Sequence, residues 1–172
     1  MPTRVEILKT LANSQERLLA RYRAFTPQEL DCSCTESATP GRAAWRPQDH
    51  LVHLAMIERK FQAMIHRTLQ KEPDPVGFSR TGATNREEVI AWINRQNQDH
   101  VEAHHDDNMQ TILEDRAATR KKTLELLGQL TDEQLALPVP GAPWADGTIG
   151  GLIITNAHHE ALHLAWIEEG LR

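Results

Sequence analysis

The chain has 172 residues, of which 40% are hydrophobic, and this suits one folded domain over residues 1–172. The net charge is −5 and no block of Lys and Arg stands out, which argues against a nucleic-acid-binding surface. No apolar run reaches the length of a membrane span, and the first residues lack the apolar core of a signal peptide. We therefore expect a cytoplasmic protein without membrane contact.

The first third of the chain predicts two helices joined by a loop. Apolar residues recur at three- and four-residue spacings over residues 3–25, which predicts an amphipathic helix. The Thr-Pro-Gln-Glu stretch from Thr26 has the spacing of a capping box, so a short turn begins there. Residues 31–46 are rich in Ser, Thr, Pro and Gly and are predicted as loop. Cys32 and Cys34 stand too close for an easy disulfide, and we interpret them as ordinary loop thiols rather than a metal clamp.

Helix signals continue to the end of the chain. Pro47 opens a second long helix, Thr84 and its neighbours form a capping box, and Thr148 can cap the last helix. The helices predicted after the first loop cover residues 47–70, 86–105, 109–130 and 149–172. The chain is therefore predicted to be all-α.

A repeated stretch suggests how these helices are arranged. The pattern His-Leu-Ala-x-Ile-Glu occurs twice, beginning at His53 and at His163. Each copy follows a long helix, a Thr-x-x-x-Leu turn and a loop that ends near Trp45 or Trp144. Two such helix pairs predict a four-helix bundle with a pseudo-twofold axis and an additional helix before the third core helix. On this reasoning His53 and His163 are corresponding positions that the axis brings together. The two tryptophans either form a wall of the pocket or pack at helix caps, and we prefer cap packing.

The last helix carries the clearest candidate ligands. At about 100° per residue, His163 lies within the apolar stripe and His159 lies at its edge one turn earlier. Two imidazoles at this spacing reach one metal ion. Glu160 and Asn156 fall on the same stripe. Glu160 is the candidate catalytic residue, as a base or a support for a ligand, and Asn156 is a candidate support.

The second long helix offers the third imidazole, from His50 or His53, and the duplication selects His53. His50 then becomes a candidate support for the ligands. Three imidazoles leave coordination positions open, which is typical of a catalytic site, and zinc, nickel, iron and manganese all remain possible. His100, His104 and His105, on or beyond the polar third helix, are interpreted as solvated, and His66 on the second long helix has no special partner.

The stretch from His159 to His163 also matches the HExxH pattern of zinc proteases, with Glu160 as the base. That interpretation needs a third ligand further along the chain, but no histidine follows His163. No predicted sheet edge would hold a peptide. We therefore prefer the site shared between two helices.

These motifs resemble those of the DinB/YfiT-like superfamily. The resemblance rests on Trp45-Arg46-Pro47, on His53 followed by Leu54-Ala55, on the His159-x-x-x-His163 pair, and on the closing Leu171-Arg172. It implies a four-helix bundle with a metal held by His53, His159 and His163, and often a homodimer. Relatives include mycothiol-dependent maleylpyruvate isomerase and bacillithiol transferases. His50 and Arg46 depart from the usual pattern.

We expect a metal-dependent enzyme that activates a low-molecular-weight thiol or water against a small electrophilic substrate. Thiol transfer, isomerisation and hydrolysis all remain open. The alternative is a non-catalytic metal- or ligand-binding bundle with a role in stress response. A purely structural bundle would hold no metal and lose little stability on chelation.

Overall fold

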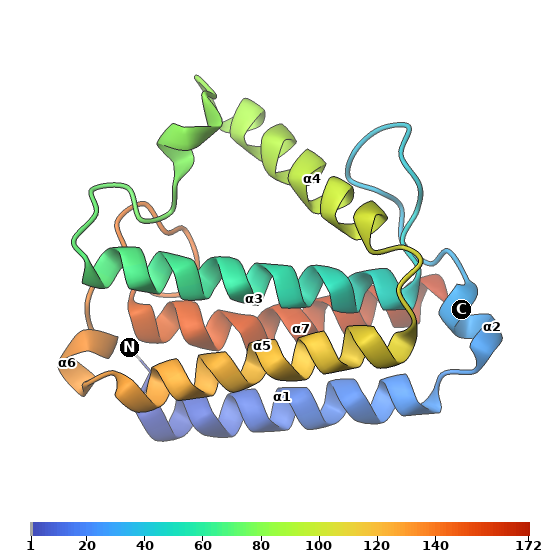
Figure 1. The fold of residues 1–172 in the computed structure, drawn as a ribbon, viewed down its shortest axis with the longest axis horizontal. Coiled ribbons are helices and arrows are strands. Elements are labelled where there is room, and N and C mark those ends of the chain that lie inside the picture. The colour runs from blue at the N-terminus through green and yellow to red at the C-terminus, as the bar shows by residue number, and fades with distance from the viewer. Residues whose placement is uncertain (1) are drawn as a thin grey trace.

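The computed structural model describes residues 2–172 and is an all-α protein, as predicted. Its frame is a four-helix bundle of α1 (Arg4–Ala24), α3 (Pro47–Leu69), α5 (Met109–Gln129) and α7 (Ile149–Gly170) (Figure 1). The remaining elements are α2 (Pro27–Asp31), the 3₁₀ helix η1 (Phe78–Thr81), α4 (Arg86–Ala103) and α6 (Asp132–Leu135). The additional helix before the third core helix is α4, which lies against α3 outside the bundle (Figure 1).

Local sequence signals set the helix starts. The side chain of Thr148 caps α7 by accepting a hydrogen bond from the Gly151 amide, and α5 begins in the same way at Asn108. These side chains satisfy amide groups that have no partner within the helix. At α3, the Asp49 carboxylate accepts a hydrogen bond from the Arg46 amide at 2.8 Å. Each of these helices therefore begins where the sequence predicts.

The two halves of the chain repeat one plan. In each half a long helix leads to a short helix with a capping box, then to an isolated antiparallel bridge, then to the second long helix. The bridges join Thr35 to Trp45 and Pro138 to Thr148. Helices α1 and α7 run in one direction and α3 and α5 in the other (Figure 1). This arrangement is the predicted pseudo-twofold duplication.

Two apolar clusters fill the bundle, one toward each end. The first includes Ile7, Phe61 and Ile149, and the second includes Leu18 and Leu51. Side chains of both clusters are almost completely buried and supply the main driving force for folding. On α3, α5 and α7 a polar segment separates the two clusters.

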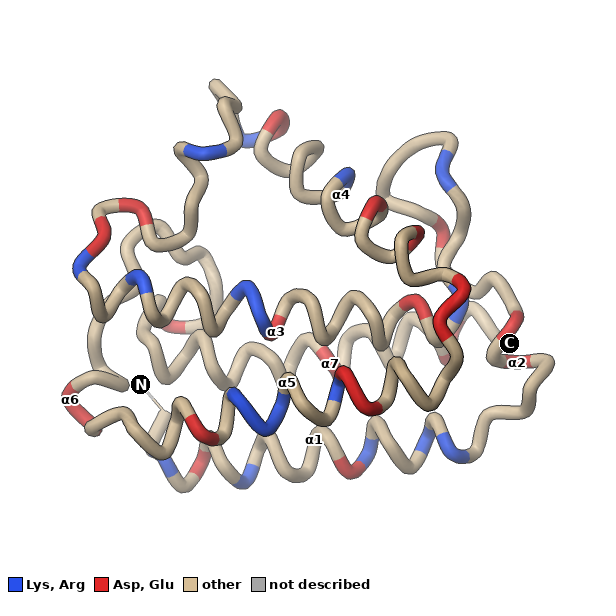
Figure 2. The backbone as a smooth tube through the Cα atoms, viewed as in Figure 1, with Lys and Arg blue, Asp and Glu red and all other residues tan. Residues whose placement is uncertain are grey.

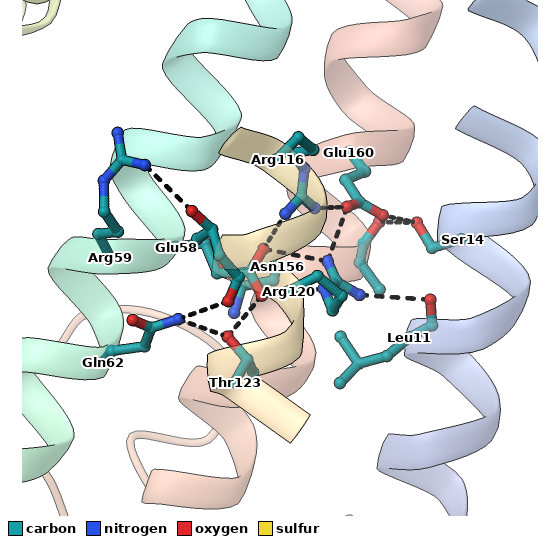
Figure 3. A network of polar contacts seen from close by, with 12 residues as sticks. Leu11, Ser14, Glu58, Arg59, Gln62, Arg116, Arg120, Thr123, Asn156 and Glu160 are labelled. Atoms are coloured by element: carbon teal, nitrogen blue, oxygen red, sulfur yellow. Dashed lines mark hydrogen bonds and ion pairs between the residues drawn. The ribbon is translucent and has the colours of Figure 1, made fainter. Parts of the chain in front are cut away.

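That polar segment is a buried charge cluster of Glu58, Arg116, Arg120 and Glu160 (Figure 3). Arg120 Nε lies 2.9 Å from Glu58 Oε1, and an Arg120 terminal nitrogen lies 2.7 Å from Glu160 Oε1. Arg116 pairs with both carboxylates. The two positive and two negative charges balance, which offsets the cost of taking them out of water. The charge cluster joins α3, α5 and α7.

The charge cluster also fixes the register of the duplication. Counted from the first residue of each helix, Glu58 of α3 matches Glu160 of α7. Both carboxylates are buried and both bind Arg116 and Arg120. The pseudo-twofold axis therefore passes close to the charge cluster.

Acidic and basic residues are interspersed along the sequences of α1 and α5 (Figure 2). None of the helices within residues 2–172 has the length and apolar character that a membrane crossing requires.

Candidate metal centre

His53, His159 and His163 each bring an imidazole nitrogen within 4.8 Å of the other two. His53 comes from α3, and the other two lie one turn apart on α7. The Nε2 atoms of His159 and His163 are 2.9 Å apart. The ring centroid of His53 lies 5.2 Å from that of His159 and 4.8 Å from that of His163. We call these three residues the histidine triad, and they form a set that can hold one metal ion.

Imidazole donors in this environment fit a divalent transition metal. His53 Nδ1 is buried and has no hydrogen-bond partner within the described chain. Three neutral nitrogens suit zinc, nickel and iron, whereas a carboxylate-rich site would favour magnesium or calcium. No carboxylate belongs to the triad as the structure describes it.

His50 contacts His163 on the side of its ring that is turned away from His159. Its Nδ1 lies 2.7 Å from Nδ1 of His163, and its Nε2 lies 3.1 Å from the hydroxyl of Thr35. Because Nε2 of His163 faces His159, the contact with His50 occupies the nitrogen that points away from the triad. Such outer contacts hold a ligand ring in place and select its tautomer. His50 therefore lies in contact with His163 but outside the triad itself.

Burial keeps these histidines neutral at pH 7. It lowers the pKa of His50 and of His159 to about 4. Burial, together with the neighbouring imidazoles, also lowers the pKa of His53 and of His163 well below the usual value. Only a neutral imidazole has a lone pair to offer a metal, so the set is ready to coordinate.

Two cavities meet at the triad. The first cavity has a volume of about 550 Å³ and lies between the loop before α3, α4 and the end of α7. Its walls include Cys34, Thr35, Trp45, Asn94, Trp166 and Glu169. The second cavity, of about 410 Å³, lies between α3, α4 and η1, and its walls include Ile57, Lys60, Phe61, Phe78, Trp92 and Trp144. His53, His159 and Asn97 line both.

The two tryptophans form walls of the cavities rather than packing only at helix caps. The ring of Trp45 lies 5.0 Å from His53 and 5.2 Å from His50, measured between centroids. Its Nε1 donates to Gln98 Oε1 at 2.8 Å, which fixes the ring from the α4 side. Trp144 lines the second cavity and packs against Phe61 at 5.3 Å. The sequence signal for this role was that Trp45 and Trp144 each stand just before a helix that carries histidines of the site.

Glu160 lies elsewhere. Its carboxylate belongs to the charge cluster, where it pairs with Arg116 and Arg120 and accepts a hydrogen bond from the Ser14 hydroxyl at 2.5 Å. Asn156 is also on that side, beside the charge cluster (Figure 3), and its amide donates to the Ile153 carbonyl. Neither residue lines either cavity. This placement does not support the catalytic role expected for Glu160 or the supporting role expected for Asn156.

His53 and His163 lie close together, but not because they are equivalent positions of the duplication, as expected. His53 lies near the start of α3, and His163 lies near the end of α7. Because the two helices are antiparallel, these positions meet at the same end of the bundle (Figure 1). When α3 and α7 are aligned so that Glu58 matches Glu160, the residue of α7 that corresponds to His53 is Thr155. The two His-Leu-Ala-x-Ile-Glu stretches are therefore not symmetry equivalents.

The remaining candidates divide between solvent and the fold. His66 and His105 are exposed, as expected, but His100 is half-buried and burial lowers its pKa to about 4. Cys32 is exposed, whereas Cys34 lines the first cavity and burial raises the pKa of its thiol.

A family model described as the DinB superfamily matches residues 45–167, a segment that contains the whole triad. No curated protein and no solved structure gives a significant match.

Proposed function

Since the chain belongs to the DinB superfamily, we propose that it is a metal-dependent enzyme that acts on a small electrophilic substrate with a low-molecular-weight thiol or water as the nucleophile. The observation that carries this proposal is the position of the histidine triad, which stands where two cavities meet. A metal held there is accessible to two molecules from different sides.

The triad is built as an open site. Structural zinc sites use four protein ligands, whereas catalytic sites use three and leave a position for substrate. When bound, a divalent cation supplies Lewis acidity, which lowers the pKa of a coordinated thiol or water. Zinc, nickel, iron and manganese are the candidates for that cation.

The surrounding residues have separate tasks in this proposal. His50 holds His163 in its ligating orientation through the contact at 2.7 Å. Trp45 covers the triad and limits the access of bulk water, which strengthens electrostatic interactions inside the site. The first cavity, with polar groups from Thr35, Asn94 and Glu169, accommodates a polar thiol cosubstrate. The second cavity accommodates the electrophile.

Two adjoining cavities favour a reaction between two bound molecules. We therefore place thiol transfer first, with thiol-assisted isomerisation as a variant of it, and hydrolysis second, because water needs no cavity of about 550 Å³. In the transfer reaction the thiol gives up its proton to solvent, its sulfur forms a bond to the electrophilic carbon, and the leaving group departs with the bonding electron pair. A protease of the HExxH type has less support, because Glu160 is engaged with Arg116 and Arg120.

The test begins with elemental analysis of protein purified without a histidine tag. The expected result is about one transition metal per chain in the wild type and in His66→Ala, an exposed control on α3, and its loss in His163→Ala. No metal in the wild type, with none taken up on addition, would overturn the proposal in favour of a structural bundle.

Activity is then measured on the metal-loaded protein. 1-Chloro-2,4-dinitrobenzene with a panel of small thiols tests transfer, and p-nitrophenyl acetate tests hydrolysis. Rates that need both the metal and a thiol support transfer. Stable metal binding without either activity would support the non-catalytic binding bundle. Light scattering on the same preparation tests the homodimer that we propose from the family resemblance.

A further inference from the structure

The second cavity has an unusual charge balance for a chain with a net charge of −5. Its lining contains three cationic side chains, Lys60, Arg67 and Arg80, and no Asp or Glu. The rest of the lining is mostly apolar and aromatic. A cavity of this kind complements a ligand that has an apolar body and a negative charge.

Two of the three cations already have partners in the protein. Arg67 donates from Nε to the Pro75 carbonyl at 2.7 Å, and Arg80 forms an ion pair with Glu72 at 2.9 Å. Both interactions fix the segment that leads from α3 to η1. These arginines therefore have a role in the fold besides any effect on a ligand.

Lys60 is different. Its ammonium has one polar contact in the described structure, with Asn97 Oδ1 at 3.3 Å, and no carboxylate lies within ion-pair distance. The side chain is half-buried, and burial lowers the pKa of its ammonium. A partly desolvated charge without a counter-charge costs free energy that a bound anion would recover.

The position of Lys60 connects it to the triad. It follows His53 by two turns of α3, so both side chains lie on the same face of the helix. Asn97, which contacts Lys60, lines both cavities. An anionic group held by Lys60 is therefore next to the place where the cavities meet.

We propose that Lys60 and Asn97 form a carboxylate-binding site, and that the electrophilic substrate is a small apolar carboxylate whose body packs against Phe61, Phe78, Trp92 and Trp144. The assignment of this ligand as the substrate rests on the proposed function, whereas its binding does not. One ammonium balances the single charge of a carboxylate, and the amide of Asn97 can turn to donate from its nitrogen. A phosphate with two charges would need a second available cation.

The experiment compares two probes of nearly equal shape, 3-phenylpropionate and the neutral 3-phenylpropanamide. Binding is measured by calorimetry on the full chain, both treated with EDTA and loaded with metal. The variants are Lys60→Met, which removes the charge, Lys60→Arg, which keeps it, and Lys121→Met, which removes an exposed lysine on α5. Circular dichroism verifies that each variant folds.

The expected result is that metal-free wild type and Lys121→Met prefer the carboxylate by roughly tenfold or more. Lys60→Met loses this preference while its affinity for the amide is unchanged, and Lys60→Arg retains most of it. Equal binding of both probes to the wild type, or an unchanged preference in Lys60→Met, overturns the proposal. A preference that exists only with metal and survives in Lys60→Met means that the carboxylate binds the metal instead, which also overturns it.

The metal-free arm separates this inference from the proposed function. A protein that holds no metal, or shows no turnover, can still distinguish the two probes through Lys60. Conversely, a metal-dependent enzyme that fails to distinguish them has the proposed function but a different substrate class.

Discussion

His50 Nδ1 and His163 Nδ1 lie 2.7 Å apart, although the two residues come from different helices. One of these nitrogens must carry the proton. If Nε2 of His163 coordinates a metal, Nδ1 of His163 carries the proton and donates a hydrogen bond to Nδ1 of His50. His50 then carries its own proton on Nε2 and donates to the Thr35 hydroxyl at 3.1 Å. One chain of hydrogen bonds thus runs from the triad to the loop before α3.

Replacement of His50 should weaken metal binding without abolishing it. We expect His50→Ala to lower the affinity by about 10- to 100-fold, because His163 loses the contact that fixes its ring and tautomer. His50→Gln should retain part of the affinity, since its amide can still accept a hydrogen bond. Competition with a chromophoric chelator measures the effect, with His66→Ala as the control. Wild-type affinity in His50→Ala would show that the contact has no supporting role.

Breaking the charge cluster should cost far more stability than breaking a surface ion pair. Arg120→Met leaves two buried carboxylates with one guanidinium, and we expect a loss of about 3–5 kcal/mol. Arg59→Met removes an exposed pair with Asp115 and should cost about 1 kcal/mol or less. Urea unfolding of both variants measures the difference. Similar losses in the two variants would contradict the importance given to burial.

The charge cluster also predicts acid sensitivity. Burial by itself would raise the pKa of Glu58, but Arg116 and Arg120 outweigh it and hold the pKa below 4.5. The unfolded chain therefore binds this proton at a higher pH than the folded protein. Its contribution to stability is present above about pH 4.5 and is lost as the pH falls through the folded pKa.

The measurement is the slope of the unfolding free energy against pH between about 5 and 3.5. In Glu58→Gln the slope should be shallower than in the wild type by up to about 1.4 kcal/mol per pH unit. The variant will also be less stable at every pH, so only the slope decides. Identical slopes would mean that Glu58 has an ordinary pKa in the folded protein.

Gly170 should not accept a side chain. A Cβ atom at this position would lie 1.7 Å from the carbonyl oxygen of Cys34, so the loop before α3 or the end of α7 would have to move. We expect Gly170→Ala to destabilise by about 1–3 kcal/mol. Gly128→Ala is the matched control, since its Cβ meets no atom within 4 Å and alanine favours the helix by about 0.5–1 kcal/mol. Thermal unfolding should therefore shift in opposite directions.

Metal removal should lower stability and leave the helices intact. Both apolar clusters and the charge cluster form without any contribution from the triad, so chelation removes only the free energy of binding. At a free metal concentration of about 100 times Kd this corresponds to a fall in Tm of about 5–10 °C. Circular dichroism with and without EDTA tests it. Loss of helical signal at 25 °C would instead indicate a structural metal.

The helices could be predicted from the sequence because their signals are local. Capping residues such as Thr148 and Asn108 satisfy amides a few residues away, and the apolar spacing repeats every turn. His159 and His163 could be found for the same reason, because one turn of one helix brings them together.

The rest depends on contacts between helices, which a single-helix pattern does not contain. Glu160 was correctly predicted to face inward, but the angle on α7 does not say whether its neighbour is the triad or an arginine. Arg116 and Arg120 give no sign of burial, since charged residues usually mark the solvent face. Lys60 and Asn97 were missed because their meeting at the second cavity depends on where α4 packs.

The register of the two helix pairs has a consequence for how a site arises in a duplicated fold. In the register that matches Glu58 with Glu160, the partners of His53, His159 and His163 are Thr155, Ile57 and Phe61. All three partners line the second cavity. The symmetric frame thus provides the same three places twice, with imidazoles in one set and mostly apolar side chains in the other. Side-chain differences between equivalent places thus separate the histidine triad from the mostly apolar wall of the second cavity.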